Sequence, residues 1–179
     1  MNLISPQYAQ LNRRYHSESK SFGTGARHFV DLVRQLSDSL GTRDVLDYGC
    51  GKGNLKILLG WPIEEYDPGI EEKSAPPEPA DIVICASVLE HVETDCMDSV
   101  IADLRRCTRK AGLFVVPHNP AVDVLPDGSN AHRTVRHHNW WKQKIGEQFE
   151  IRSSAQMSSI TSNDPHAMMI GSRTYFLVT

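Results

Sequence analysis

Apolar residues recur along this chain with helical spacing in some stretches and as unbroken runs in others. In residues 26–40 they follow a three-to-four-residue period, which predicts a helix that ends at Gly41. Thr94 or Asp95 is expected to cap a second helix, and Gly112 is expected to end it. The apolar face of this second helix would consist of Met97, Val100, Ile101 and Leu104.

Shorter apolar segments between the helices predict strands. Residues 81–86 form a continuous apolar run, as expected of a strand buried on both faces. Further strands are predicted at residues 43–47, 63–67, 113–116, 149–157 and 173–178. Strands that alternate with helices predict an α/β fold with a doubly wound, mostly parallel sheet. The last two strands are expected to close this sheet as an antiparallel pair.

The first predicted strand runs straight into a glycine-rich turn, residues 45–55, and a short helix follows. Gly49, Gly51 and Gly53 alternate through the turn, where positive φ and close approach of the backbone to a ligand are needed. The turn is also expected to aim free N–H groups outward at the mouth of the sheet. Together these features predict a ligand site at the carboxyl end of the strand.

Two ligand types compete for this turn. A dinucleotide fold favours G-x-G-x-x-G, but Asn54 occupies the position of the third glycine. Asp47, two residues before the first glycine, would be poorly placed beside a pyrophosphate and well placed for a cationic amino-acid head. A glycine turn without a ligand is the third alternative.

Length and charge narrow the class of protein. The chain has 179 residues, which suits one domain, and its net charge of −3 is mixed, so no global field favours nucleic acid. No apolar run approaches the ~18–20 residues of a membrane helix, and residues 1–3 lack the features of a signal peptide. A soluble, cytoplasmic protein is therefore expected.

Cysteine and histidine usage gives no sign of metal binding. The four cysteines lack C-x-x-C spacing and fall inside predicted elements, so buried reduced thiols are expected. Among eight histidines, His137 and His138 are adjacent and no pair lies on a clean helix face, so no metal site is predicted. The cysteines are Cys50, Cys85, Cys96 and Cys107.

An acid also ends the brief second strand. Asp67 lies fourteen positions after Gly53, near where a second-strand carboxylate would reach ribose hydroxyls. A turn-forming aspartate before Pro68 is the simpler alternative and is compatible with that role. Four prolines in residues 68–80 exclude a helix or a central strand there.

Residues 87–92, Ser-Val-Leu-Glu-His-Val, directly follow the buried run at 81–86. Ser87 and Glu90 fit a capping box, so part of this pattern could reflect the start of a helix alone.

Two of these motifs carry a resemblance to a known family. The pattern hydrophobic-hydrophobic-Asp-x-Gly-x-Gly-x-Gly at 45–53 resembles motif I of class I S-adenosylmethionine-dependent methyltransferases. Leu89-Glu90-His91 resembles the loop that flanks the cofactor in small-molecule members. The resemblance covers residues 26–116 well and implies a Rossmann-like methyltransferase sheet with S-adenosylmethionine as cofactor. The cofactor-binding residues it implies are Asp47, Gly49, Cys50, Gly51, Gly53, Asp67, Pro68, Ala86, Ser87 and Leu89.

The chain departs from the family in two places. Residues 68–80 usually hold a further helix and strand, so the sheet is expected to be shortened between its second and fourth strands, and the adenine pocket is in doubt. Residues 1–25 are expected to form a lid or arm with one short amphipathic turn and a hinge at 21–25, although a frayed terminus is the alternative. Residues 26–179 would be a single domain.

The implied reaction is methyl transfer to a small metabolite or nucleotide. The segment after the fourth strand lacks the Asn/Asp-Pro-Pro-Tyr/Phe motif of amino-methylating DNA enzymes. A nucleic-acid-modifying enzyme remains an alternative, because residues 133–144 interleave basic residues with Trp140 and Trp141. A catalytically silent S-adenosylmethionine-binding protein is the other alternative. Nothing in the sequence indicates an oligomeric state.

The long loop at residues 117–139 is expected to handle the acceptor. His91, His118 and His132 could take a proton near neutral pH. Arg133, with Arg136, could hold a phosphate or carboxylate. Each histidine alone could equally be structural, so it is the set that predicts a catalytic role.

Overall fold

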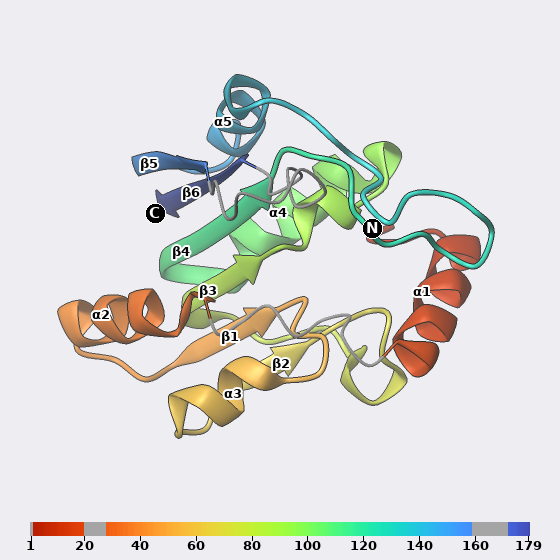
Figure 1. Ribbon diagram of the computed structural model, residues 1–179. Coiled ribbons are helices and arrows are strands. Elements are labelled where there is room, and N and C mark those ends of the chain that lie inside the picture. The colour runs from red at the N-terminus through yellow and green to blue at the C-terminus, as the bar shows by residue number, and fades with distance from the viewer. Residues whose placement is uncertain (1, 20–27, 159–171) are drawn as a thin grey trace, which may run out of the picture.

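The computed structural model describes residues 2–19, 28–158 and 172–179, and their strands form one six-stranded sheet (Figure 1). The strand order is β2-β1-β3-β4-β6-β5. β1 pairs in parallel with β2 and β3, β3 pairs in parallel with β4, and β6 runs antiparallel between β4 and β5. The predicted mostly parallel sheet with an antiparallel C-terminal strand is confirmed. The strands are β1 (Val45–Tyr48), β2 (Glu64–Tyr66), β3 (Ala80–Ala86), β4 (Thr108–Pro117), β5 (Ile151–Ser158) and β6 (Ser172–Val178).

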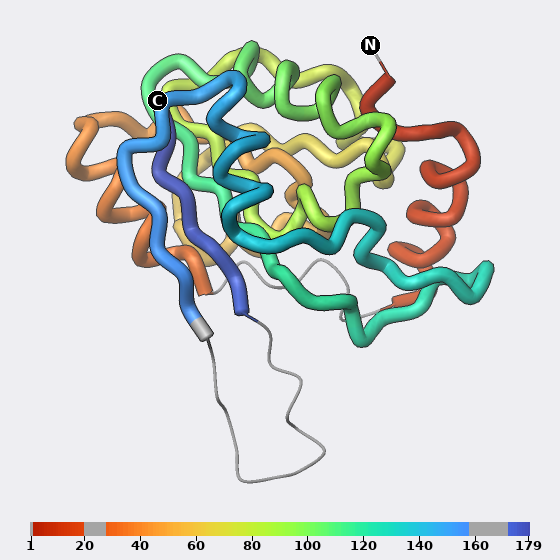
Figure 2. Tube along the Cα trace, turned by 90° about the horizontal axis from the view of Figure 1, so that it is seen from above, coloured from red at the N-terminus to blue at the C-terminus, as the bar shows by residue number. Residues whose placement is uncertain are grey.

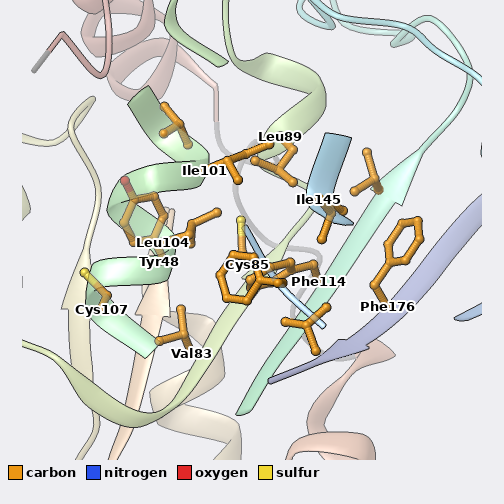
Figure 3. Packing of buried hydrophobic residues seen from close by; sticks show 14 of the residues in the cluster. Tyr48, Val83, Cys85, Leu89, Ile101, Leu104, Cys107, Phe114, Ile145 and Phe176 are labelled. Atoms are coloured by element: carbon orange, nitrogen blue, oxygen red, sulfur yellow. The ribbon is translucent and has the colours of Figure 1, made fainter. Parts of the chain in front are cut away.

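Helices cover both faces of the sheet. On one face α2 (Val30–Leu40) and α3 (Asn54–Leu59) pack with Ile82 and Ile84 of β3. On the other face α4 (Met97–Cys107) and α5 (His138–Gly146) form a larger core that includes Val83 of β3. Figure 3 shows this second core, in which α4 lies over the middle strands. Alternate side chains of β3 thus enter opposite cores, as in a doubly wound fold.

The strand order reverses at β1, whose neighbours are β2 on one side and β3 on the other. Ligands of open α/β sheets bind outside the carboxyl ends of the strands at such a reversal. A further helix, α1 (Pro6–Glu18), and residues 118–137 lie together beyond that end of the sheet, in Figure 1 and again in the turned view of Figure 2.

A series of side-chain hydrogen bonds that begins at Tyr48 of β1 holds the shortened segment after β2, residues 69–79. The Tyr48 hydroxyl donates to Asp103 of α4 (2.9 Å), and Asp103 pairs with Arg106 (2.8 Å). Arg106 in turn donates twice to the carbonyl of Pro77. Residues 69–79 contain one 3₁₀ turn, η2 (Glu71–Lys73), and no strand, as predicted.

Three expectations about the helices were wrong. Neither Thr94 nor Asp95 caps α4: both lie in the 3₁₀ turn η4 (Thr94–Cys96), and Cys96 precedes α4 without a side-chain cap bond. Gly112 does not end a helix: α4 ends at Cys107, and Gly112 lies inside β4. A Cβ at Gly112 would lie 2.8 Å from Phe114 and Val178, so the glycine admits close side-chain packing. The N-terminal segment is a 13-residue helix instead of one short turn, capped by the Ser5 hydroxyl, which accepts from the Tyr8 N–H. The proposed hinge at 21–25 lies outside the described residues.

Candidate active site

The glycine turn is held by the end of β2. Gly49, Gly51 and Gly53 have φ of 80°, 52° and 76°, in the left-handed region as predicted. The N–H groups of Gly49 and Cys50 both donate to the carbonyl of Tyr66, at 2.7 and 3.0 Å. The Gly51 N–H donates to the carboxylate of Asp67 at 2.9 Å, and the Gly69 N–H donates to the same group at 2.8 Å.

The expectation of free N–H groups at this turn was therefore wrong. A pyrophosphate site needs such groups as donors, but here the N–H groups of residues 49–51 already serve carbonyl and carboxylate acceptors of the chain. The acidic side chains beside the turn, Asp47 and Asp67, line the cavity instead, and they suit a ligand with a cationic group. Asp67 is 7% exposed and ties the turn to the end of β2, so it is at once a turn residue and part of the site.

Asp47 is an unusual acid because the fold buries it at the carboxyl end of β1, 6% exposed. Burial, with the nearby carboxylates of Glu65 and Asp67 and against the opposing effect of Lys73, raises the pKa of its carboxyl to about 7. Asp47 thus holds a proton more tightly than an ordinary aspartate until a cation comes near.

The segment after β3 closes over the glycine turn. Ser87 has φ of 58°, a rare backbone conformation for a residue with a side chain, and its N–H donates to the carbonyl of Val115 at 2.8 Å. Val88 follows and packs closely on Gly49. A Cβ added to Gly49 would lie 2.4 Å from a side-chain methyl of Val88. The 3₁₀ turn η3 (Leu89–His91) begins without a side-chain cap, so the expected capping box between Ser87 and Glu90 is not formed.

A cavity of about 380 Å³ lies at this end of the sheet. Its lining includes ten residues that the sequence pointed to: Asp47, Gly49, Cys50, Gly51, Asp67, Pro68, Ala86, Ser87, His91 and His132. Further lining residues that the sequence did not single out include Asn12, His16, Phe29, Leu55, Glu90 and Asp123.

α1 covers the cavity. One face of this helix lines the cavity with three side chains spaced one turn apart, Tyr8, Asn12 and His16. At the start of α1, the N–H and hydroxyl of Ser5 both donate to Glu93, at 2.8 Å each. Near its end, the Tyr15 hydroxyl donates to Asp123 at 2.7 Å.

Three titratable side chains of the cavity lining, two from η3 and one from the loop after β4, meet one another. Nε2 of His91 and Nε2 of His132 lie 4.0 and 3.9 Å from the Glu90 carboxylate, and the two imidazole rings meet edge to face. Burial raises the pKa of Glu90 to about 8. Burial, with the nearby His132, lowers the pKa of His91 to about 4, and burial also lowers the pKa of His132.

The remaining predicted site residues lie elsewhere. Leu89 is fully buried in the larger core, and Gly53 is the N-cap of α3, facing Glu65. His118 contacts the hydroxyls of β6, with 2.9 Å from its Nε2 to Oγ1 of Thr174. Arg133 lies outside the cavity, with its guanidinium 5.5 Å from the Tyr8 ring centre.

The two tryptophans of α5 differ in exposure. Trp141 is fully buried in the larger core, whereas Trp140 is half-buried with the Arg136 guanidinium 5.6 Å from its ring centre. Lys144 pairs with Asp98 and Glu147. The four cysteines are free and buried, as predicted. No helix in the described part of the chain is long and apolar enough to cross a membrane.

This sheet, with a glycine turn after β1, an acid after β2 and a cavity over the strand ends, defines a class I methyltransferase fold. Solved structures support this at low sequence identity, where the likeness concerns the fold. One is the 1,6-didemethyltoxoflavin-N1-methyltransferase of Burkholderia thailandensis, crystallised with 1,6-didemethyltoxoflavin and S-adenosylhomocysteine, with 17% identity, a TM-score of 0.64, and 99% of this chain and 91% of that chain covered.

Two further solved structures are similar over nearly the whole chain. Magnesium protoporphyrin IX methyltransferase of Synechocystis PCC 6803, with bound S-adenosylmethionine, has 16% identity and a TM-score of 0.63, covering 99% of each chain. The N-methyltransferase NodS of Bradyrhizobium japonicum WM9, in complex with S-adenosylhomocysteine, has 13% identity and a TM-score of 0.60, covering 96% and 97%. A comparison with curated proteins gave no match.

The family itself follows from the sequence. A family model described as a methyltransferase domain matches residues 21–161, so this chain belongs to the methyltransferase domain family. The predicted class, an S-adenosylmethionine-dependent methyltransferase, is confirmed.

Proposed function

We propose that this chain methylates a small molecule that binds under α1, at the end of the cavity that Glu90, His91 and His132 line. The observation that carries the proposal is a single cavity with two chemically different ends. One end has carboxylates beside a glycine turn, and the other has a glutamate with two imidazoles. A donor and an acceptor can thus lie end to end in a space closed off by a helix.

The residues at the first end fit S-adenosylmethionine. Asp47 offers negative charge for its cationic amino-acid part, and Asp67, at the end of β2, could reach the ribose hydroxyls. The loop N–H groups are not arranged for a phosphate. Phe29, Leu55 and Ile84 add an apolar wall that suits a flat purine. When bound, S-adenosylmethionine supplies an electrophilic methyl group on a sulfonium.

The chain's own residues would position the acceptor and keep water out. Neutral imidazoles at His91 and His132 can hold or accept a proton from an acceptor nucleophile. α1 excludes solvent, because Ser5 and Tyr15 anchor it at both ends of the cavity roof. His118 and Arg133, which lie outside the cavity, would have at most an indirect part.

The size and cover of the cavity favour a small acceptor over a nucleic acid. About 380 Å³ is within the range of small-molecule sites and is shared by donor and acceptor. In residues 133–144 Trp141 is buried and Lys144 pairs with Asp98 and Glu147, whereas Arg133, Arg136 and Lys142 are exposed. The preference for a small acceptor therefore rests on the cavity. A solved structure with this fold contains a small heterocyclic acceptor, 1,6-didemethyltoxoflavin.

Labelled S-adenosylmethionine tests this proposal directly. The purified chain is incubated with the labelled donor in two separate reactions. One reaction contains the small-molecule fraction of a cell extract, and the other contains its nucleic-acid fraction. Label is expected in the small-molecule fraction, and the Gly51→Val protein should transfer none. Label in nucleic acid alone would contradict the proposal. Donor binding by calorimetry with label in neither fraction would contradict it too, and would indicate a silent binding protein.

A further inference from the structure

The cluster at the acceptor end has the composition of a metal site. Glu90, His91 and His132 each offer one ligand atom, and these atoms all lie within 4.8 Å of one another. Glu90 and His91 are neighbours in η3, whereas His132 comes from the loop that follows β4, forty-one positions later. Only the fold brings His132 to the pair, which explains why no ligand spacing is visible in the sequence.

Both imidazoles are held in the tautomer that binds metal ions through Nε2. Nδ1 of His91 lies 2.8 Å from the carbonyl of Ala131, and Nδ1 of His132 lies 2.5 Å from the carbonyl of Asn119. A carbonyl can only accept, so Nδ1 carries the proton in each ring and Nε2 keeps its lone pair in the neutral form. Backbone carbonyls that fix a ring in this way are the usual outer partners of metal-binding histidines.

Glu90 is the strongest sign that something is to be bound here. Its carboxylate is 1% exposed, and neither oxygen has a hydrogen-bond partner among the described residues. Buried carboxylates are normally paired or coordinate a metal, because burying an unpaired charge is costly.

We propose that Glu90, His91 and His132 bind a divalent first-row transition-metal ion of the zinc type at the acceptor end of the cavity. The inference rests on the proposed function only for what the ion would do: when bound it would occupy the Nε2 lone pairs in place of a proton, and its remaining positions would take an oxygen or nitrogen of the acceptor. Two nitrogens and one carboxylate with an open position form a donor set of catalytic metal sites. Imidazole ligands disfavour Mg²⁺ and Ca²⁺, which prefer oxygen.

The distances need only a small adjustment. Metal–nitrogen and metal–oxygen bonds of about 2.0–2.2 Å place tetrahedral ligand atoms roughly 3.4 Å apart. The two Nε2–Oε1 distances are 4.0 and 3.9 Å and all three ligand atoms lie within 4.8 Å of one another, so side-chain movements of up to about 1 Å would close the site. His132 also lines a second hollow beside Thr94 and Arg133, which gives an ion a route from solvent.

Cobalt titration of the metal-free protein, without donor, tests the site. Protein stripped with a chelator is titrated with Co²⁺, whose visible absorption reports imidazole and carboxylate ligands, and Zn²⁺ is then added to displace it. We expect one Co²⁺ per chain with a dissociation constant below about 10 µM, and at least tenfold weaker binding in Glu90→Gln and in His132→Asn. His137→Ala removes an exposed histidine and should change the affinity by less than about twofold.

Donor binding, measured separately by calorimetry, shows that the variants are folded and separates the two hypotheses. If the wild-type protein binds donor but no Co²⁺ or Zn²⁺, or if Glu90→Gln and His132→Asn bind Co²⁺ as tightly as wild type, the metal site is overturned and the proposed function stands. If Co²⁺ binds as expected but no acceptor is methylated, the metal site stands and the proposed function fails.

Discussion

The two ends of the cavity are built in different ways. At the donor end, the glycine turn and Asp67 lie within about twenty residues of sequence and satisfy each other through backbone bonds. At the acceptor end, Glu90 and His91 meet His132 from a distant loop, and the Glu90 carboxylate has no hydrogen-bond partner among the described residues. The donor end is complete without its ligand, whereas the acceptor end is not.

This difference shows what each end requires of its residues. A turn held by backbone hydrogen bonds depends on positive φ angles and on close approach of neighbouring atoms to its backbone. Few residue types fit such a turn, so it is recognisable from a short stretch of sequence. A cluster of side chains depends on tertiary placement, so its members can come from any part of the chain. Substitutions at the donor end should therefore act on affinity and geometry, and those at the acceptor end on turnover.

The largest effect is expected from Gly51→Val. Gly51 has φ of 52°, which a β-branched residue does not tolerate, and its N–H bond to Asp67 would be lost. Calorimetry should show donor affinity at least about 100-fold weaker, or no binding.

Gly60→Val is the matched control. Gly60 has φ of 79° at the end of α3, and a Cβ there would meet nothing within 4 Å. The strain should lower the free energy of unfolding by about 1–3 kcal/mol and leave donor affinity unchanged. Equal losses of donor affinity in the two variants would mean that strain alone explains the effect at Gly51.

The acceptor end should give a smaller effect on a different quantity. Once an acceptor is known, His132→Ala should lower kcat at least about tenfold while donor affinity stays within about twofold, because the donor end is intact. Its neighbour Arg133 lies outside the cavity, so Arg133→Ala should lower kcat by less than about threefold. Equal losses in both variants would mean that the loop acts only as a cover.

The smallest effect is a pH dependence of donor affinity. Asp47 has a pKa of about 7 in the free protein, and binding a cationic ligand requires the carboxylate. Affinity should therefore rise with pH up to about 7 and then level off, with roughly eightfold weaker binding at pH 6 than at pH 7.5.

Calorimetry in buffers of different ionisation enthalpy should detect proton release on binding below pH 7. Work below pH 7.5 avoids most of the titration of the ligand's own amino group, which is expected near 8. Asp47→Asn should bind more weakly and lose this dependence. A wild-type affinity that is flat from pH 6 to 7.5 would show that Asp47 does not meet the cation.

The sheet and the donor end were largely predictable from the sequence. The apolar run at 81–86 marks a strand covered on both faces, and β3 occupies residues 80–86. The alternating glycines require positive φ, and each of the three has it. These features depend on near neighbours in the sequence, so a pattern of residue types is enough to find them.

The sequence misled where one residue type serves two purposes. Gly112 was expected to end a helix, but it makes room for Phe114 and Val178 between strands that are far apart in sequence. Glu90 fitted a capping box, yet its side chain turns into the cavity beside His132. In both cases the decisive contact is with a residue far away in the sequence, Val178 or His132, which local spacing does not encode.

The attachment of α1 has a consequence for the kinetics of ligand exchange. α1 pairs with no strand and is held by side-chain bonds such as Ser5 with Glu93 and Tyr15 with Asp123, plus a small apolar cluster of its own around Tyr8. Neither main core includes it. Releasing this one helix therefore costs far less than unfolding the domain. Substrates and products can exchange through a sub-global opening, so residence times and global stability can be tuned separately in this protein.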